Sequence, residues 1–266
     1  MNTADELKKI VKEKYGEIAD QSNSKKGCGC GCSPSDDYTV FSEDYSKLDG
    51  YNPDADLQLG CGLPTQYAMI QKGDTVVDLG SGAGNDCFIA RALTGDEGRV
   101  IGLDFTEEML AKARKNTASL GFSNVEFVKG EIEKIPLPEN TADVVVSNCV
   151  MNLVPDKNKA FSETYRILKP GGHFSISDIV LQGDLPTALK NEAALYAGCV
   201  SGAVQKEDYL ETVRNAGFIN LVIQKQKEID LPKEIYLKYL SENDFKQFKA
   251  SGRGIFSITL NADKKE

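Results

Sequence analysis

The stretch VVDLGSGAGND, residues 76–86, decides the fold. It begins as a short buried strand, and glycines 80, 82 and 84 follow directly, ahead of a helix-like stretch that runs to Leu93. Glycines in such a turn allow the backbone to approach a ligand closely. Open α/β sheets bind their ligands at this place, outside the carboxyl ends of the strands. The stretch therefore predicts an α/β protein with a ligand on Gly80, Gly82 and Gly84.

Strands and helices alternate along the rest of the chain. Strands are expected at 75–79, 99–104, 125–130, 142–148, 173–181, 220–229 and 254–262. One helix is expected to start at Thr106 as its N-cap and to run to Leu120, and another to cover 157–172 up to a proline and two glycines. This alternation predicts a doubly wound, Rossmann-like sheet of seven strands with helices on both faces.

The chain also has an extension before this core and an insertion within it. Apolar residues at helical spacing predict an amphipathic helix over 4–19, and the Gly/Ser/Cys segment 21–37 reads as a loop. The expected organisation is an N-terminal helix and Cys-rich extension (1–65), a ligand-binding core (66–181), a region that caps the substrate site (182–215), and C-terminal strands and helices that complete the core (216–266).

Composition excludes several classes of function. The net charge of -9 and the absence of a Lys/Arg block argue against nucleic acid as a partner. No apolar run approaches the roughly 20 residues that span a bilayer, and the charged N-terminus is no signal peptide, so we expect a cytoplasmic protein without a membrane partner. In that compartment seven cysteines favour ligand or redox thiols over structural disulfides. The single His173 makes Ser-His-Asp chemistry and multi-histidine metal sites improbable.

The glycine spacing indicates which ligand the turn holds. Dinucleotide folds use G-x-G-x-x-G, whereas the third glycine here falls one residue early. Asp78, two residues before the first glycine, would repel a phosphate but suits an amino-acid moiety. These residues, with Asp104 at the end of the second strand, resemble motifs I and II of Rossmann-like S-adenosylmethionine methyltransferases.

That resemblance implies S-adenosylmethionine as cofactor and a role for each matching residue. Asp104 would accept the ribose hydroxyls. In GEIEKIP, Ile132 would contact adenine through its backbone, and Glu131 or Glu133 would receive the adenine amino group. The expected cofactor-binding set is Asp78, Gly80, Gly82, Gly84, Asp104, Phe105, Glu131, Ile132, Glu133 and Asn148.

Several cysteines are candidates for the methyl acceptor site. Cys149, in SNCVMNL, lies just past the fourth strand, Cys61 lies in LGCGLPT, and Cys199 in YAGCVSGA. Because Cys61 is flanked by two glycines, we expect its thiol to be accessible and free to reorient. Cys87, among apolar neighbours in DCFIA, is expected to be a core residue.

These motifs, together with GSGAGNDCF and the C-terminal SITLNA, resemble the arsenite methyltransferase family from about Tyr15 to the end of the chain. The resemblance implies a trivalent arsenic site at Cys149 and Cys199, joined by Cys61, with Cys32 or a neighbour as the redox partner of Cys61. Soft arsenic binds thiolates well. Its lone pair can take the methyl group without a general base, and a disulfide relay would restore the trivalent state. Expected partners are arsenite or its thiol adducts, methylarsenite, and a thioredoxin or glutathione-type reductant.

Some alternatives stay open from sequence. Cys28, Cys30 and Cys32 form a CGCGC loop that could itself capture a soft metal, and any one of them could pair with Cys61. Residues 70–180 would equally fit a methyltransferase of a quinone-like small molecule, although that reading gives the thiols no purpose. A thiol-based metal-storage protein would have no use for the cofactor residues.

Overall fold

The computed structural model describes residues 4–24, 42–187, 189, 200 and 202–266. The strands are β1 (Thr75–Leu79), β2 (Arg99–Asp104), β3 (Val125–Lys129), β4 (Ala142–Asn148), β5 (Leu168–Gln182), β6 (Ile219–Ile229) and β7 (Gly254–Asp263). The helices are α1 (Ala4–Ser24), α2 (Pro64–Tyr67), α3 (Asn85–Thr94), α4 (Glu107–Leu120), α5 (Lys157–Ile167), α7 (Lys206–Asn215), α8 (Lys233–Leu237) and α9 (Glu242–Ala250), with a 3-10 turn η2 (Met151–Leu153). Cys28, Cys30, Cys32 and Cys199 lie outside the described residues.

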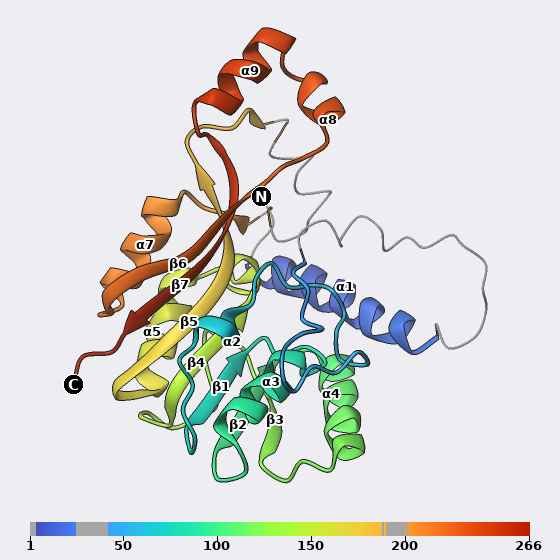
Figure 1. Ribbon diagram of the computed structural model, residues 1–266, viewed down its shortest axis with the longest axis vertical. Coiled ribbons are helices and arrows are strands. Elements are labelled where there is room, and N and C mark those ends of the chain that lie inside the picture. The colour runs from blue at the N-terminus through green and yellow to red at the C-terminus, as the bar shows by residue number, and fades with distance from the viewer. Residues whose placement is uncertain (1–3, 25–41, 188, 190–199, 201) are drawn as a thin grey trace.

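The seven strands form one sheet in the order β3-β2-β1-β4-β5-β7-β6. The strands β1 to β5 are parallel, and β7 runs antiparallel to both β5 and β6. The predicted doubly wound, seven-stranded fold is thus confirmed (Figure 1). Because the chain leaves β1 toward β2 on one side and returns to β4 on the other, the carboxyl ends of β1 and β4 flank the point where such sheets bind ligands.

Alternate side chains of β1 face two separate cores, as the period of a strand requires. Val76 packs in a cluster with Phe88 of α3 and Leu110 of α4. Val77 points the other way, into a cluster with Phe161 of α5 and Tyr209 of α7. Helices α3 and α4 therefore cover one face, and α5 and α7 cover the other (Figure 1). The helix α7 comes from the segment expected to cap the substrate site, and it packs on α5 and β5.

The boundary between α5 and β5 differs from the sequence prediction. The helix ends at Ile167, and residues 168–172, where the sequence predicted the end of the helix and the Pro-Gly-Gly that terminates it, begin β5. Pro170 has no N–H to donate and restricts Lys169 to extended conformations, so the helix cannot pass through this point. Leu168 instead pairs with Ala142, and a register shift follows before His173 joins the ladder.

Strands β5, β6 and β7 continue past the parallel strands and carry α8 and α9 at their far end (Figure 1). A cluster of buried residues fills this end: Cys61, Cys149, Ile179, Leu181, Leu189, Val200, Ala203, Ile229, Leu231, Ile235, Tyr236, Phe248 and Ile255. Cys61 and Cys149 therefore belong to a third cluster, separate from the two cores on the faces of the sheet.

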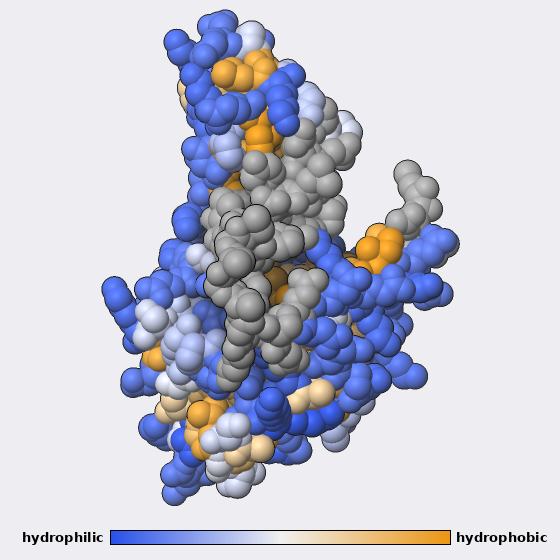
Figure 2. Space-filling model, turned by 90° about the vertical axis from the view of Figure 1, so that its right-hand side faces the viewer, coloured by the Kyte–Doolittle hydropathy of each residue, from blue (hydrophilic) through white to orange (hydrophobic). Residues whose placement is uncertain are grey.

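Most of the surface in Figure 2 is hydrophilic, whereas apolar residues gather over α8 and α9.

The N-terminal part of the chain folds back on the sheet. The helix α1 is longer than the predicted 4–19 and packs against α4. Residues 42–63 lie against α3, where Tyr45 and Leu63 bury Ile89. No helix among the described residues is long and apolar enough to span a membrane.

Candidate functional site

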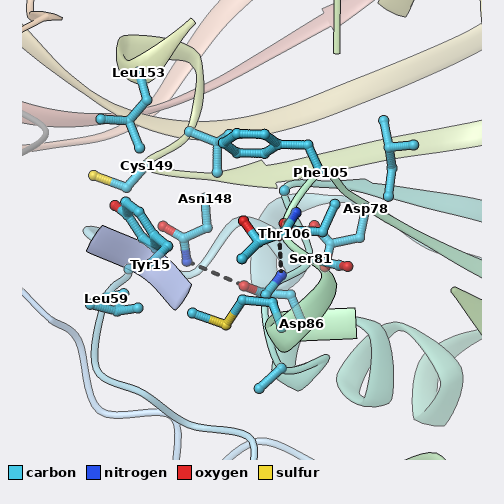
Figure 3. A pocket seen from close by; sticks show the side chains of 18 of the residues that line it. Tyr15, Leu59, Asp78, Ser81, Asp86, Phe105, Thr106, Asn148, Cys149 and Leu153 are labelled. Atoms are coloured by element: carbon cyan, nitrogen blue, oxygen red, sulfur yellow. Dashed lines mark hydrogen bonds between the residues drawn. The ribbon is translucent and has the colours of Figure 1, made fainter. Parts of the chain in front are cut away.

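A cavity opens at the carboxyl ends of β1, β2 and β4 and is closed on one side by Lys8, Val11 and Tyr15 of α1. In Figure 3, Cys149 and Tyr15 lie at one side of this cavity and Asp78 at the other. Nine of the ten expected cofactor residues line the cavity: Asp78, Gly80, Gly82, Asp104, Phe105, Glu131, Ile132, Glu133 and Asn148. Gly84, the tenth, forms the N-cap of α3.

The glycine turn has the conformation that its sequence predicts. Gly80, Gly82 and Gly84 all have positive φ angles, which L-residues with a side chain rarely adopt. A Cβ atom at Gly80 would lie 2.5 Å from the Val150 side chain. At Gly82 the nearest atom would be 4.0 Å away, so this residue leaves open space beside the cavity. The first glycine is needed for packing, and the second leaves room for a ligand.

Asp104 is fixed by the backbone at the end of β2. Its Oδ1 accepts a hydrogen bond from the Thr106 N–H at 2.8 Å, and its Oδ2 accepts one from the Gly82 N–H at 3.0 Å. Burial raises the pKa of this carboxyl group, and these N–H groups oppose the rise. Thr106 lies at the N-cap of α4, as predicted, but its hydroxyl makes no capping bond. The buried Ser81 hydroxyl has no hydrogen-bond partner among the described residues.

Two buried carboxylates lie next to one another beside the cavity. Asp78 accepts a hydrogen bond from the Cys87 thiol at 3.3 Å, and Asp86 lines the cavity as well. Burial raises the pKa of Asp78 well above its usual range, and the charge of Asp86 adds to the rise. Burial also raises the pKa of Asp86, to about 6. Such a pair favours a positively charged ligand group, because a cation lowers the cost of keeping both carboxylates ionised.

Asp86 and Tyr45 are site residues that the sequence analysis missed. The Tyr45 hydroxyl donates to Asp86 Oδ2 at 3.0 Å, Thr65 donates to Oδ1 at 3.4 Å, and Asn148 Nδ2 donates to Oδ2 at 3.3 Å. Asp86 stands at the end of the decisive stretch, so its proximity to the site could have been predicted. Nothing in the irregular segment around Tyr45 indicates that it reaches the site.

The segment after β3 carries the expected adenine contacts and is held by α1. Ile132 is buried, and Lys8 forms ion pairs with both Glu131 and Glu133. The Glu133 side chain is nearly buried and accepts from the Asp156 N–H, while that of Glu131 is half exposed. Both glutamates therefore face the cavity, in different surroundings.

The three described cysteines are all buried, and none of them forms a disulfide. Cys87 is fully buried, as predicted. The expectation that Cys61 has an accessible and freely turning thiol is wrong, because Cys61 is only 2% exposed. Its flanking glycines serve close packing instead: a Cβ at Gly60 would lie 2.6 Å from Asn148 Nδ2, and one at Gly62 would lie 2.5 Å from the Ser177 hydroxyl.

Cys149 has an unusual backbone conformation. Its φ angle is +61°, which is rare for a residue with a side chain. Its N–H donates to the Ser177 carbonyl at 2.7 Å, which extends the β4–β5 ladder by one bond. Local strain of this kind is found where the surrounding structure holds a residue for a functional reason. Cys149 lines the cavity and also belongs to the cluster that contains Cys61.

Known proteins combine the same fold with the same motifs. A family model of a methyltransferase domain matches residues 70–217. An arsenite methyltransferase of Halobacterium salinarum is 38% identical over 98% of this chain and 67% of its own length, and one of Aquipseudomonas alcaligenes is 33% identical over 88% and 68%.

Among solved structures, CrArsM is similar to this chain. It is an arsenic(III) S-adenosylmethionine methyltransferase from Chlamydomonas reinhardtii, with a TM-score of 0.64, 33% identity, and coverage of 77% of this chain and 68% of its own. The cavity, the glycine turn and the comparisons agree. The chain belongs to the arsenite methyltransferase family of S-adenosylmethionine-dependent methyltransferases.

Proposed function

We propose that this enzyme transfers a methyl group from S-adenosylmethionine to trivalent arsenic held by cysteine thiolates. The observation that carries the proposal is the position of Cys149, which lines the cofactor cavity just past the end of β4. Cys61 belongs to the same buried cluster. In the proposed site these two thiolates and that of Cys199 bind the arsenic.

The residues of the cavity fit the cofactor. Asp104, held by two N–H groups, has the charge to accept two hydroxyls of a ribose, and the unpartnered Ser81 hydroxyl would gain a partner from a bound ligand. Asp78 faces the place where a positively charged amino group would lower the cost of its burial. When bound, S-adenosylmethionine supplies an electrophilic methyl group on a sulfonium sulfur.

The adenine part of the cavity is assigned to the segment after β3. Ile132 would contact the base through its backbone, and Phe105 contributes an apolar wall. Either Glu131 or Glu133 would accept a hydrogen bond from the exocyclic amino group of adenine. Lys8 forms ion pairs with both glutamates, so it would compete with adenine for them. Cofactor binding would therefore loosen the contact between α1 and this segment.

Buried thiolates suit arsenic chemistry. A soft arsenic centre prefers sulfur ligands, and three thiolates leave it one lone pair. If that lone pair points along the cavity toward the methyl group, positioning and the exclusion of water provide the catalysis, and no general base is required. The burial of Cys61 and Cys149 supports this proposal, because a buried site keeps water away from the arsenic.

A disulfide relay would return the arsenic to its trivalent state. Methylation uses the lone pair and so oxidises arsenic formally. A second thiolate, which we assign to Cys32 in preference to Cys28 or Cys30, would attack the arsenic-bound sulfur of Cys61. The S–S bond forms, the As–S bond breaks, and its electron pair returns to arsenic, which keeps two thiolates and one methyl group. A thioredoxin or glutathione-type thiol would then reduce the disulfide by exchange.

Single Cys→Ser variants at 61, 149 and 199 test the proposal with two substrates. Each methyl group already on arsenic removes the need for one thiolate. Cys149→Ser and Cys199→Ser should therefore lose activity on both arsenite and methylarsenite. Cys61→Ser should lose activity on arsenite but keep some on methylarsenite. Serine preserves size and removes the soft, ionisable ligand.

Cys87→Ser is the matched control for this series. Cys87 lies in a different cluster, and a serine hydroxyl can keep the hydrogen bond to Asp78. This variant should methylate both substrates. Equal loss on both substrates for Cys61→Ser would assign Cys61 a redox or structural role and would refute the three-sulfur site.

A further inference from the structure

The turn that carries Cys61 is bound to the residue next to Cys149. The Asn148 side chain accepts the Cys61 N–H at its Oδ1 at 3.0 Å and donates from its Nδ2 to the Gly62 carbonyl at 2.8 Å. One amide therefore holds the backbone on both sides of the Cys61 thiol. Because Asn148 precedes Cys149 in the chain, this amide also sets where the Cys61 backbone lies relative to that of Cys149.

The orientation of this amide is fixed by its surroundings. Reversing it would place the NH₂ group against the Cys61 N–H and the oxygen against the Gly62 carbonyl, two repulsive contacts. The Asp86 carboxylate and the Tyr45 hydroxyl oxygen also lie within hydrogen-bond distance of Nδ2, so the two N–H groups of the amide are shared among three acceptors. Tyr45 in turn donates to Asp86, so every polar atom of this group has a complementary partner.

The Cys61 turn has little freedom to compensate if this amide is lost. The contacts of Gly60 and Gly62 described above press the backbone against Asn148 and Ser177. The Cys61 carbonyl accepts from the Ser257 hydroxyl at 2.5 Å, and the Cys149 N–H is bound to Ser177. The backbones of Cys61 and Cys149 are thus each bonded to the sheet, and the Asn148 side chain connects one to the other.

We infer that Asn148 is a positioning residue of the arsenic site, which fixes Cys61 at the distance from Cys149 that a shared arsenic atom requires, and that Tyr45 and Asp86 orient its amide. The inference rests on the proposed function, in which both thiolates bind one arsenic atom. It gives Asn148 a role on the arsenic side of the cavity in addition to the cofactor contact expected from sequence.

Binding measurements on two arsenicals test this role. Tyr45→Phe keeps the ring and removes the hydroxyl that orients the amide, and Asn148→Ala removes the amide itself. Both should weaken arsenite binding, by about tenfold for Tyr45→Phe, as expected for a net loss of about one hydrogen bond. Methylarsenite, which in the proposed site needs only Cys149 and Cys199, should bind within about twofold of wild type, because the position of Cys61 does not affect it; twofold is about 0.4 kcal/mol, less than one net hydrogen bond.

Two further measurements separate positioning from general stability. X-ray absorption at the arsenic edge should find three sulfur neighbours for arsenite bound to wild type and two for Asn148→Ala. Adding Tyr45→Phe to Cys61→Ser should cause no further loss of arsenite affinity, because the residue being positioned is already gone. Tyr51→Phe is the matched control, since its hydroxyl donates to Asp56 in the same N-terminal segment and not to Asp86 or Asn148. It should bind both arsenicals as wild type does.

The outcomes distinguish the inference from the function on which it rests. If Cys61→Ser loses arsenite affinity while Tyr45→Phe and Asn148→Ala keep it, the positioning role is wrong and the three-sulfur site stands. Equal weakening of both arsenicals by Tyr45→Phe would also overturn the positioning role, because it would indicate a general structural effect. If Cys61→Ser itself binds arsenite like wild type, the three-sulfur site is wrong and the inference falls with it.

Discussion

The function proposed for Asp104 is supported by its position and by its backbone contacts. Asp104→Ala should weaken S-adenosylmethionine binding, because in the proposed site it removes two charge-assisted hydrogen bonds to the ribose, each contributing about 1.5–3 kcal/mol. Arsenite affinity should change little. Isothermal calorimetry with each ligand measures both affinities. Glu97→Ala, which removes an exposed carboxylate in the turn before β2, is the control. Cofactor affinity equal to wild type would refute the assignment.

Asp178 should give the protein a measurable pH dependence of stability. It is fully buried on β5, accepts from the Tyr209 hydroxyl and the Ile179 N–H, and burial raises its pKa to about 7. The folded state therefore binds this proton more tightly than the unfolded state, whose carboxyl has a pKa of about 4. Between these values the free energy of unfolding falls as pH rises, by roughly 4 kcal/mol in total.

Asp178→Asn removes this titration and keeps the size of the side chain. Urea unfolding at pH 5 and pH 8 should show a smaller loss of stability on raising the pH in the variant than in wild type. Equal losses in the two proteins would mean that Asp178 does not carry its proton in the folded state.

At the residue scale, the position of a residue relative to the end of a strand was the sequence feature that predicted its place in the candidate site. Asp78 and Asp104 could be placed at the site because each lies at the carboxyl end of a parallel strand. The burial of Cys61 could not be predicted from its glycine neighbours. Glycine permits both a loose turn and a very close approach, and only the positions of Asn148 and Ser177 decide between them.

At the scale of elements, the turn between β1 and α3 shows how close packing and backbone conformation together restrict a position to glycine. Gly80→Ala would place a side chain at a positive φ angle and within 2.5 Å of Val150. Gly121, at the C-cap of α4, has a similar φ of +68° but nothing within 4 Å of an added Cβ. Gly121→Ala should therefore cost only the backbone strain of about 1–2 kcal/mol.

Gly80→Ala should cost clearly more than Gly121→Ala and should also weaken cofactor binding. Thermal unfolding of both variants, with and without S-adenosylmethionine, checks this comparison. If the two substitutions destabilised the protein equally and left cofactor affinity unchanged, the close packing of the turn would not matter for the site.

The elements themselves were largely predictable. The central strands β1, β2 and β4 are near-continuous apolar runs, as strands buried on both faces of a sheet require. The edge strands β3 and β6 instead mix apolar with charged residues and are partly exposed. The error at 168–172 arose because a Pro-Gly pair was interpreted as a turn after a helix, whereas here it starts β5. The pairing of Leu168 with Ala142 of β4, and the backbone bonds of Gly171 and Gly172 with Lys264 just after β7, decided that outcome.

At the scale of the whole molecule, the cofactor cavity and the thiol cluster meet at Cys149. The cavity belongs to the parallel part of the sheet, and the cluster belongs to the far end of β5 and β7 with α8 and α9. The helix α1 closes the cavity from the side, and its ion pairs through Lys8 connect it to the segment after β3. The sequence could predict the cofactor cavity and the cysteines, but not that α1 covers the cavity, because contacts between segments distant in sequence leave no local pattern.

The most direct test of the account is turnover of arsenite with isotopically labelled S-adenosylmethionine and a thiol reductant, with the arsenic products separated and identified. We expect labelled methylarsenicals from the wild-type protein, and none from Cys149→Ser although that variant still binds the cofactor. Normal cofactor binding by the wild-type protein without transfer of the label to arsenic would contradict the account.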